Sequence, residues 1–428
     1  METIPQNYDV IIVGAGMVGA TLACALASSA LRIAVLDAQP LPADPPLDDD
    51  LDLRVSAITQ ASQRVFTAVG AWPGMAARRM CAFREMHVWD AGSAHPPVSA
   101  HLIYKGEIHF DSADIGANTL GHIIENRVIQ AALLNRLRSF GNITLLCPAS
   151  VASVVITHDG AQVGLGHADI NRGRPLTATL VVGADGAHSK VRQLAGIATR
   201  GWSYAQKGVV ATVKTTLPHR DTAWQRFLPS GPLAFLPLHD GRCSIVWSTT
   251  PEHADALVAM DENAFLSALE HAFGDKLGKM IPSSGASHRA AFPLHLQHAN
   301  AYTAPRLALI GDAAHTLHPL AGQGVNLGVL DAATLAEVIL DAYNSGKDIG
   351  AHGILRRYER WRKGDNLAML AIMDGFKRLF SNDLESLRWL RTQGLRLTHR
   401  LPPVKNLIMR HAMGLAGDLP KIALRSPE

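Results

Sequence analysis

The stretch Y-D-V-I-I-V-G-A-G-M-V-G, from Tyr8 to Gly19, decides the fold of the first part of the chain. Its first six residues predict a buried strand, and the small residues after Gly19 predict a helix. A second predicted strand, Arg32 to Leu36, ends at Asp37. A strand, glycines in the spacing G-x-G-x-x-G, a helix, a second strand and an acid are typical of a dinucleotide-binding βαβ unit.

Each glycine of this unit has a separate physical task. We expect Gly14 to make a tight turn, Gly16 to let the backbone approach a pyrophosphate, and Gly19 to let the helix pack closely on the strand. Asp37 is expected to accept hydrogen bonds from an adenosine ribose. The alternative is a glycine-rich turn that binds nothing. It is disfavoured because the strand, the helix and the acid are all present in register.

A second signature lies in R-L-A-L-I-G-D-A-A-H-T-L-H-P-L-A-G-Q-G-V-N-L-G, from Arg306 to Gly328. A hydrophobic strand ends in a Gly-Asp turn, and a short loop leads into a glycine-marked helix start. A carboxylate and free helix N–H groups around one volume suit a polyhydroxylated, anionic cofactor. The residues expected to contribute are Gly311, Asp312, Pro319, Gly322 and Gly324.

Length and composition indicate an ordinary globular protein. The 428 residues allow two or three domains, and 47% of them are hydrophobic and 18% charged. The N-terminus lacks the basic segment of a signal peptide, so we expect a cytoplasmic protein. The cysteines are widely spaced, which favours free thiols in a reducing compartment. They are Cys24, Cys81, Cys147 and Cys243.

Positive charge is concentrated in the last part of the chain. The net charge is +3, but residues Leu355 to Arg425 hold 15 Lys and Arg against 6 Asp and Glu. Such a region favours an anionic neighbour, either a membrane surface or another protein. A solvated helical face is the commoner alternative. The sequence contains no recognisable nucleic-acid-binding module, so no nucleic-acid partner is expected.

The order of the predicted elements indicates an α/β fold. We expect a Rossmann-type domain, an inserted and mainly antiparallel sheet domain, and a helical C-terminal region. The antiparallel sheet is predicted from the strand patterns between Gly208 and Thr250. The expected ranges are 1–72, 106–190 and 291–350 for the Rossmann-type domain, 73–105 and 191–290 for the sheet domain, and 351–428 for the helical region.

Three motifs together resemble the single-component FAD-dependent aromatic hydroxylases. They are G-x-G-x-x-G from Gly14, G-A-D-G-x-x-S-x-V-R from Gly183, and G-D-A-A-H-x-x-x-P from Gly311. Within that group the chain is most similar to the ubiquinone biosynthesis hydroxylases. This finer resemblance rests on stretches such as L-G-H-I-I-E-N-R-V-I-Q from Leu120 and H-P-L-A-G-Q-G-V-N-L-G from His318. It covers nearly the whole chain.

The resemblance implies a site for FAD and transient binding of NAD(P)H. Asp312 would bind the ribityl chain, and Asp185 would serve the flavin and the nicotinamide cofactor. Arg54 and Arg127 are cationic candidates to face the cofactor, although Arg54 has an acidic loop beside it and Arg127 an adjacent carboxylate as alternative partners. The free N–H groups of the helix that begins near Gly322 would face the flavin ring. The backbone candidates there are Gly324, Val325, Asn326 and Leu327.

The implied reaction is hydroxylation of a lipophilic aromatic substrate, a polyprenyl phenol or quinone precursor, with O₂ and NAD(P)H. Because FAD carries the chemistry, no catalytic side chain is required. Tyr204, Leu236 and Pro237 are candidate walls of the substrate pocket, with sheet core as the alternative, which we favour for Leu236. His315 and His318 lack further ligands at suitable spacing, so no metal is expected.

Several alternatives remain open from the sequence. The same chemistry on a soluble aromatic acid is one, and a flavin reductase acting on isoprenoid substrates is another. A flavin-holding scaffold without activity is the non-enzymatic alternative. The basic C-terminal region is expected to contact the inner membrane peripherally or a biosynthetic complex, with packing on the cofactor domain or in a homo-oligomer as the alternative.

Overall fold

Strand β1 (Asn7–Val13) lies at the centre of the first sheet, as its apolar sequence predicts. It pairs in parallel with β2 (Ile33–Leu36) and β11 (Leu176–Gly183). The sheet continues in parallel through β8 (Ile143–Leu146) and β19 (Leu307–Leu309). This computed structural model describes residues 5–42, 52–90, 106–166, 174–282, 288–316, 324–380, 393–394, 397–398 and 400–424.

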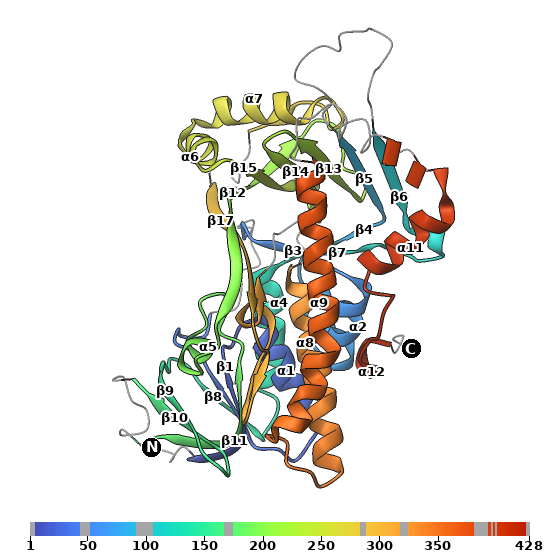
Figure 1. The fold of residues 1–428 in the computed structure, drawn as a ribbon. Coiled ribbons are helices and arrows are strands. Elements are labelled where there is room, and N and C mark those ends of the chain that lie inside the picture. The colour runs from blue at the N-terminus through green and yellow to red at the C-terminus, as the bar shows by residue number, and fades with distance from the viewer. Residues whose placement is uncertain are drawn as a thin grey trace.

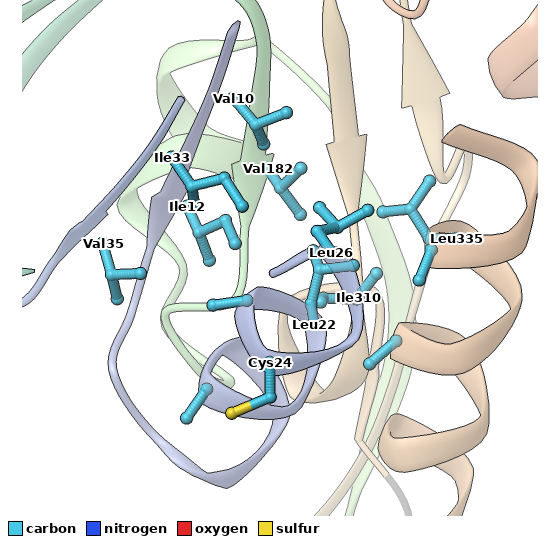
Figure 2. Close-up of a cluster of buried hydrophobic side chains, with 14 of the residues drawn as sticks. Val10, Ile12, Leu22, Cys24, Leu26, Ile33, Val35, Val182, Ile310 and Leu335 are labelled. Atoms are coloured by element: carbon cyan, nitrogen blue, oxygen red, sulfur yellow. The ribbon is translucent and has the colours of Figure 1, made fainter. Parts of the chain in front are cut away.

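Three helices pack side by side on this sheet. Helix α1 (Met17–Leu26) lies between α4 (Asn126–Leu137) and α8 (Gly324–Asn344). Apolar side chains from the strands, from α1 and from α8 fill the space between the two layers (Figure 2). A parallel sheet buried by helices is the architecture expected of a dinucleotide-binding domain, so the predicted α/β fold is confirmed.

A hairpin at residues 151–166 extends the first sheet. Strands β9 (Val151–Ile156) and β10 (Ala161–Leu165) are antiparallel, and β10 continues the first sheet by pairing with β11. Helix α5 (Lys190–Leu194) follows β11.

The second sheet is mainly antiparallel, as predicted. Its order is β20-β17-β12-β15-β14-β13-β5-β6, and only the contact of β13 with β5 is parallel among the described pairs. Helices α6 (Pro251–Ala259) and α7 (Glu262–Phe273) cover one face at the upper end of Figure 1. The strands are β5 (Glu85–Asp90), β6 (Glu107–Asp111), β12 (Thr199–Thr215), β13 (Thr222–Leu228), β14 (Gly231–Pro237), β15 (Cys243–Thr249), β17 (Ala290–Ala299) and β20 (His315–Thr316). The short β16 (Met280–Ile281) pairs with β12.

A small third sheet, β3-β7-β4, was not foreseen. It consists of β3 (Val55–Ile58), β4 (Met80–Phe83) and β7 (Gly121–Glu125). The G-H-I-I-E run of β7 is short and apolar and has no distinctive period, so the sequence does not identify it as a strand. Helices α2 (Gln60–Ala68) and α3 (Trp72–Ala76) follow β3.

Three strands join a different sheet from the one their positions suggested. Strand β6, most of β17 and β20 fall inside the ranges predicted for the Rossmann-type domain, yet all three are hydrogen-bonded in the second sheet. Strand β6 pairs with the preceding strand β5, whereas β17 pairs with the distant β12. The domain boundaries themselves stay a prediction.

The C-terminal region is helical. Helix α9 (His352–Phe380) packs on α8 and runs past both large sheets (Figure 1). Its Leu370 lies in an apolar cluster with Tyr204, Leu294 and Leu296 of the second sheet. Helices α11 (Pro402–Ala412) and α12 (Lys421–Leu424) follow. In the described part of the chain, no helix has the length and apolar character needed to cross a membrane.

Candidate active site

A cavity of about 830 Å³ lies between the first and second sheets. Residues of the glycine loop, of the Gly-Asp turn and of the start of α8 line one side, and residues of β12, β15 and β17 line the other. Its volume falls in the range of about 300–1,000 Å³ that is typical of sites for organic ligands. The cavity therefore joins the two signatures of the sequence to the inserted sheet.

The first glycine loop has the shape that the sequence predicted. Gly14 has a φ of +112°, and a Cβ atom there would lie 2.3 Å from the Ala184 carbonyl oxygen. A Cβ on Gly19 would lie 2.0 Å from the Gly14 carbonyl oxygen, so the helix and the strand touch at this point. Gly16 lines the cavity, and a Cβ there would meet nothing within 4 Å. Open space at Gly16 is what the approach of a ligand requires.

Asp37 lies at the end of β2 beside this loop. Its Oδ2 accepts a hydrogen bond of 2.8 Å from the Ala15 N–H, and its Oδ1 accepts one of 2.9 Å from the Gln39 N–H. The carboxylate thus fixes the glycine loop. It is half-buried and does not line the cavity, so its expected contact with a ribose stays a prediction.

The Gly311-Asp312 turn forms the floor of the cavity. Gly311 has a φ of +60°, and a Cβ there would press on Val18 of α1. Asp312 lines the cavity, and its side chain is exposed there, whereas Gly311, Ala313 and Ala314 beside it are buried. Burial raises the pKa of Asp312, while His315 and Arg54 act in the opposite direction. A carboxyl group exposed to the cavity is placed to hydrogen-bond the hydroxyls of a ligand.

The start of α8 is fixed by the side chain of Asn326. Its Oδ1 accepts hydrogen bonds from the Thr59 N–H at 3.0 Å and the Thr59 hydroxyl at 3.2 Å, and its Nδ2 donates to the Ala57 carbonyl at 2.8 Å. The Asn326 side chain therefore links the start of α8 to the chain segment at the end of β3. Gly324 and Val325 line the cavity, whereas Asn326 and Leu327 do not.

Two helix starts face the cavity, which suits an anionic ligand. Gly16 caps α1 without a side-chain hydrogen bond, and within their described residues neither α1 nor α8 has an acidic residue in its first turn. Their free N–H groups and dipoles favour negative charge. Pro319 and Gly322, which were predicted to contribute, lie outside the described residues, as does His318.

The G-A-D-G motif contributes backbone rather than its acid. The Asp185 carboxylate accepts hydrogen bonds from the Ser189 hydroxyl and from the Lys190 and Val191 N–H groups, and it thereby caps α5. Its neighbours Gly186 and His188 line the cavity. A cofactor contact of Asp185 itself stays a prediction.

Arg192, at the end of the same motif, joins two of the cavity walls. Its buried guanidinium donates to the Ala313 carbonyl and the Ala187 carbonyl, both at 2.8 Å. The segment after β11 is thus held against the Gly-Asp turn. The motif pattern contained this arginine, but only the structure reveals which carbonyl groups it joins.

The two predicted arginines have different surroundings. Arg54 lines the cavity, and its guanidinium carbon lies 5.7 Å from the centre of the Phe292 ring. Arg127 lies outside the cavity lining and pairs with the buried Glu125 at 3.0 Å, where Arg79 pairs as well. The ion-pair alternative for Arg127 is therefore present, although with a buried carboxylate rather than at the surface.

A buried ionic network behind the Gly-Asp turn was not predicted. Asp331 of α8 accepts a hydrogen bond from the Gly311 N–H at 3.1 Å, lies 2.5 Å from His315 Nε2, and accepts a hydrogen bond from Arg362 of α9 at 2.9 Å. Asn366 also donates to it at 3.1 Å. Burial alone would raise the pKa of Asp331, but His315 and Arg362 hold it well below its usual range. Asp331 is a positioning residue, because it acts on the turn that carries Asp312.

The side of the cavity formed by the second sheet differs from the predicted pocket. Tyr204 lies in the cluster with Leu370, Leu236 packs with Ala57 and Ile123, and Pro237 is buried at the end of β14. None of these three residues lines the cavity. Leu236 is buried in the core of the sheet, which is the alternative that the sequence favoured for it. The residues that line this side are Gly208, Val210, Ser244, Val246, Phe292 and Leu294.

The cysteines are not placed for catalysis. All four are free, and burial raises the pKa of Cys24, Cys81 and Cys243 to about 12. They are therefore neutral thiols near pH 7 and weak nucleophiles.

The residues present fit a bound FAD. Open space at Gly16 and two anion-favouring helix starts suit a pyrophosphate, and the Asp312 carboxyl in the cavity wall suits a polyhydroxylated chain. The apolar strand residues across the cavity suit a planar ring.

Comparison with known proteins agrees with this assignment. The model of a family described as FAD binding domain matches residues 7–367. The ubiquinone hydroxylase UbiL of Rhodospirillum rubrum is 40% identical over 95% of this chain and 89% of its own length. The 3-demethoxyubiquinol 3-hydroxylase of Escherichia coli is 37% identical over 96% of this chain and 99% of its own length.

A solved structure shows the same fold. PqsL, a probable FAD-dependent monooxygenase from Pseudomonas aeruginosa, superposes with a TM-score of 0.72 at 22% identity. The match covers 92% of this chain and 100% of the other.

Proposed function

Because the chain belongs to the FAD binding domain family and is an FAD-dependent monooxygenase of the ubiquinone hydroxylase type, we propose that it hydroxylates the aromatic ring of a polyprenylated ubiquinone precursor. NAD(P)H and O₂ are the co-substrates of this reaction. The observation that carries the proposal is the cavity, which combines a nucleotide-binding side with an apolar side from the inserted sheet.

In this proposal the residues of the first sheet hold the cofactor. The α1 start at Gly16 and Met17 receives the pyrophosphate, and Asp312 accepts hydrogen bonds from the ribityl hydroxyls. The α8 start at Gly324 and Val325 presents N–H groups where negative charge develops on the ring. When bound, FAD would activate O₂, and O₂ is the source of the oxygen atom that is transferred.

The residues of the second sheet orient the substrate and exclude water. Val210, Val246 and Leu294 present apolar side chains to the cavity, and Phe292 lies beside Arg54. A dry, close-fitting space keeps the activated oxygen from being lost to water and brings the ring to the reacting atom. The protein's contribution to the rate is therefore positioning and exclusion of solvent.

The activity is tested with FAD-loaded protein, a precursor phenol with a short prenyl chain, and the matched phenol without that chain. We expect O₂ uptake coupled to NAD(P)H oxidation, and a product that contains one atom of isotopically labelled O₂. Oxidation of NAD(P)H without O₂ and without an oxygenated product would identify a reductase instead. Turnover of the unprenylated phenol alone would favour a soluble aromatic substrate.

The role of Asp312 is tested by Asp312→Ala. Loss of the carboxylate from the cavity wall is expected to give protein purified without yellow FAD, with Asp341→Ala, an acid on α8 away from the cavity, as the coloured control. Full retention of FAD in Asp312→Ala would contradict the ribityl role.

We also propose that α11 contacts the membrane surface, because a polyprenylated substrate partitions into the lipid bilayer. One side of α11 packs through Met409 and Met413 on Leu120. The other side exposes Leu401, Val404, Leu407 and Ile408, each at least 40% accessible, between the exposed Arg400 and Arg410. An apolar helical face flanked by arginines is suited to the interface of an anionic bilayer.

Co-sedimentation with vesicles that contain anionic lipid tests this contact. The double variant Leu407→Ser, Ile408→Ser is expected to bind vesicles several-fold less than the wild type. Leu217→Ser, at an equally exposed leucine of the second-sheet region, is the matched control. Equal binding by all three proteins would exclude α11 as the contact.

A further inference from the structure

Two histidines and a glutamate meet on neighbouring strands of the second sheet, away from the cavity. His87 of β5 lies directly opposite His109 of β6 in the antiparallel register. Glu85 precedes His87 by two residues, so its side chain leaves the same face of the sheet. The imidazole rings of His87 and His109 are stacked, with centroids 4.1 Å apart.

The ligand atoms of these three side chains converge. Glu85 Oε2 lies 2.9 Å from His109 Nε2 and 3.9 Å from His87 Nε2, and one ligand atom from each residue lies within 4.8 Å of the other two. Two ligand atoms on one tetrahedral Zn²⁺ are roughly 3.4 Å apart, given bonds of about 2.0–2.1 Å. Side-chain adjustments of about an ångström would complete such a set.

The environment of His87 holds its ring in place. Glu107 Oε1 lies 3.3 Å from Nδ1 of His87 and 3.1 Å from Lys276 Nζ, and the Trp224 ring stacks on the imidazole at 4.7 Å. A carboxylate that accepts the Nδ1 proton leaves the Nε2 lone pair facing Glu85, which is the usual outer contact of a metal-binding histidine. Burial and the neighbouring His109 lower the pKa of His87, so the imidazole is neutral near pH 7.

The cluster is open to solvent on one side. The side-chain exposures are 39% for Glu85, 21% for His87 and 31% for His109. An ion can therefore enter, and water can occupy a fourth position. Two carboxylates, Glu85 and Glu107, face one cation, Lys276, so the local charge also favours a bound metal ion.

We propose that Glu85, His87 and His109 form a binding site for one divalent transition-metal ion such as Zn²⁺, with Glu107 as the residue that orients His87. Two imidazoles and one carboxylate are a ligand set that Zn²⁺ prefers over Mg²⁺ or Ca²⁺, which take oxygen ligands. Binding replaces the hydrogen bond between His109 and Glu85, so the proton on His109 Nε2 leaves that atom, to Nδ1 of a neutral ring or to solvent from an imidazolium. The ion would cross-link β5 and β6 at the edge of the sheet.

The test is calorimetric titration of chelator-treated, FAD-loaded protein with zinc chloride. We expect one equivalent of Zn²⁺ to bind to the wild type. His87→Ala and His109→Ala are each expected to weaken the affinity more than about tenfold, and Glu107→Gln by about tenfold, as is usual for loss of an outer contact. His352→Ala, at an exposed histidine at the start of α9, should leave the affinity unchanged.

Glu85→Gln separates loss of a ligand from loss of folding, because it keeps the shape of the side chain. It should weaken Zn²⁺ binding while the flavin absorbance and the metal-free unfolding midpoint stay those of the wild type. No binding of Zn²⁺ at about millimolar concentration by the wild type would overturn the proposal. So would an affinity that is the same in the wild type, His109→Ala and Glu85→Gln, since the ion would then be held elsewhere.

Discussion

At the scale of single residues, Asp331 connects three parts of the site that are far apart in sequence. It holds the Gly311 N–H, faces His315 and binds Arg362 of α9, and its side chain is fully buried. No local pattern around residue 331 predicted this, because an acid inside an apolar helix acquires its partners only through tertiary packing. By contrast, Asp312 was predicted, since its partners are the neighbouring turn and helix start.

Removing the charge of Asp331 is expected to destabilise the protein and its cofactor site together. Asp331→Asn leaves the buried Arg362 without its carboxylate, and loss of one partner of a buried pair costs about 3–5 kcal/mol. Urea unfolding should show this loss, and FAD should dissociate faster. Asp365→Asn also removes a carboxylate near Arg362, but an exposed one, and should cost less than about 1 kcal/mol. Equal effects of the two variants would contradict the role of Asp331.

His298 makes stability depend on pH. Burial, His315 and Lys363 lower the pKa of His298 to about 4, and its Nε2 lies 3.0 Å from the Tyr302 hydroxyl. The unfolded chain takes up a proton near pH 6.5 while the folded protein does not, so folding stability falls as pH falls from about 6.5 towards 4.

Between pH 7 and pH 5, this one histidine should remove about 1–2 kcal/mol of stability. The measurement is the free energy of unfolding at both pH values. His298→Gln cannot titrate, so its loss on acidification should be smaller than that of the wild type by this amount. A variant with the same pH dependence as the wild type would exclude His298 as the cause.

At the scale of elements, the start of α8 is held in place by β3. The three hydrogen bonds of Asn326 reach Ala57 and Thr59, which are remote in sequence. The helix itself was predicted from its glycine-marked start. The contact of this helix with β3 was not predicted, because the strands of the third sheet are short apolar runs and were not recognised as strands.

Asn326→Ala is expected to loosen this helix start. The Thr59 N–H and the Ala57 carbonyl lose their partner inside the protein, which costs about 1–3 kcal/mol for each buried group left unpaired. FAD affinity should fall several-fold, as measured by fluorescence of released flavin. Asn344→Ala lies at the exposed far end of the same helix and should leave both stability and affinity unchanged. Loss of stability without loss of FAD affinity would show that the helix start does not contact the cofactor.

At the scale of the whole molecule, the sequence predicted the side of the cavity formed by the first sheet much better than the other. Glycine spacing and acids at strand ends are local signals, so Gly14, Gly16 and Asp312 were identified directly. Alternation along β12 and β15 indicates two faces but not which face meets the cavity. Val210 and Val246 were therefore missed, and Tyr204 and Pro237 were named instead. The pairing of β17 with β12 was missed as well, since it joins strands that are distant in sequence.

The central place of β1 in the first sheet has a consequence for synthesis of the protein. Gly14 leaves the ribosome early, yet its neighbour β11 and the Gly311-Asp312 turn after β19 follow much later, the last of them almost 300 residues on. At about 5–20 residues per second, the nascent chain waits roughly 15–60 s before the turn exists. Flavin capture is therefore a late event in translation, and the early βαβ unit lacks its neighbour β11 for about the first half of that time.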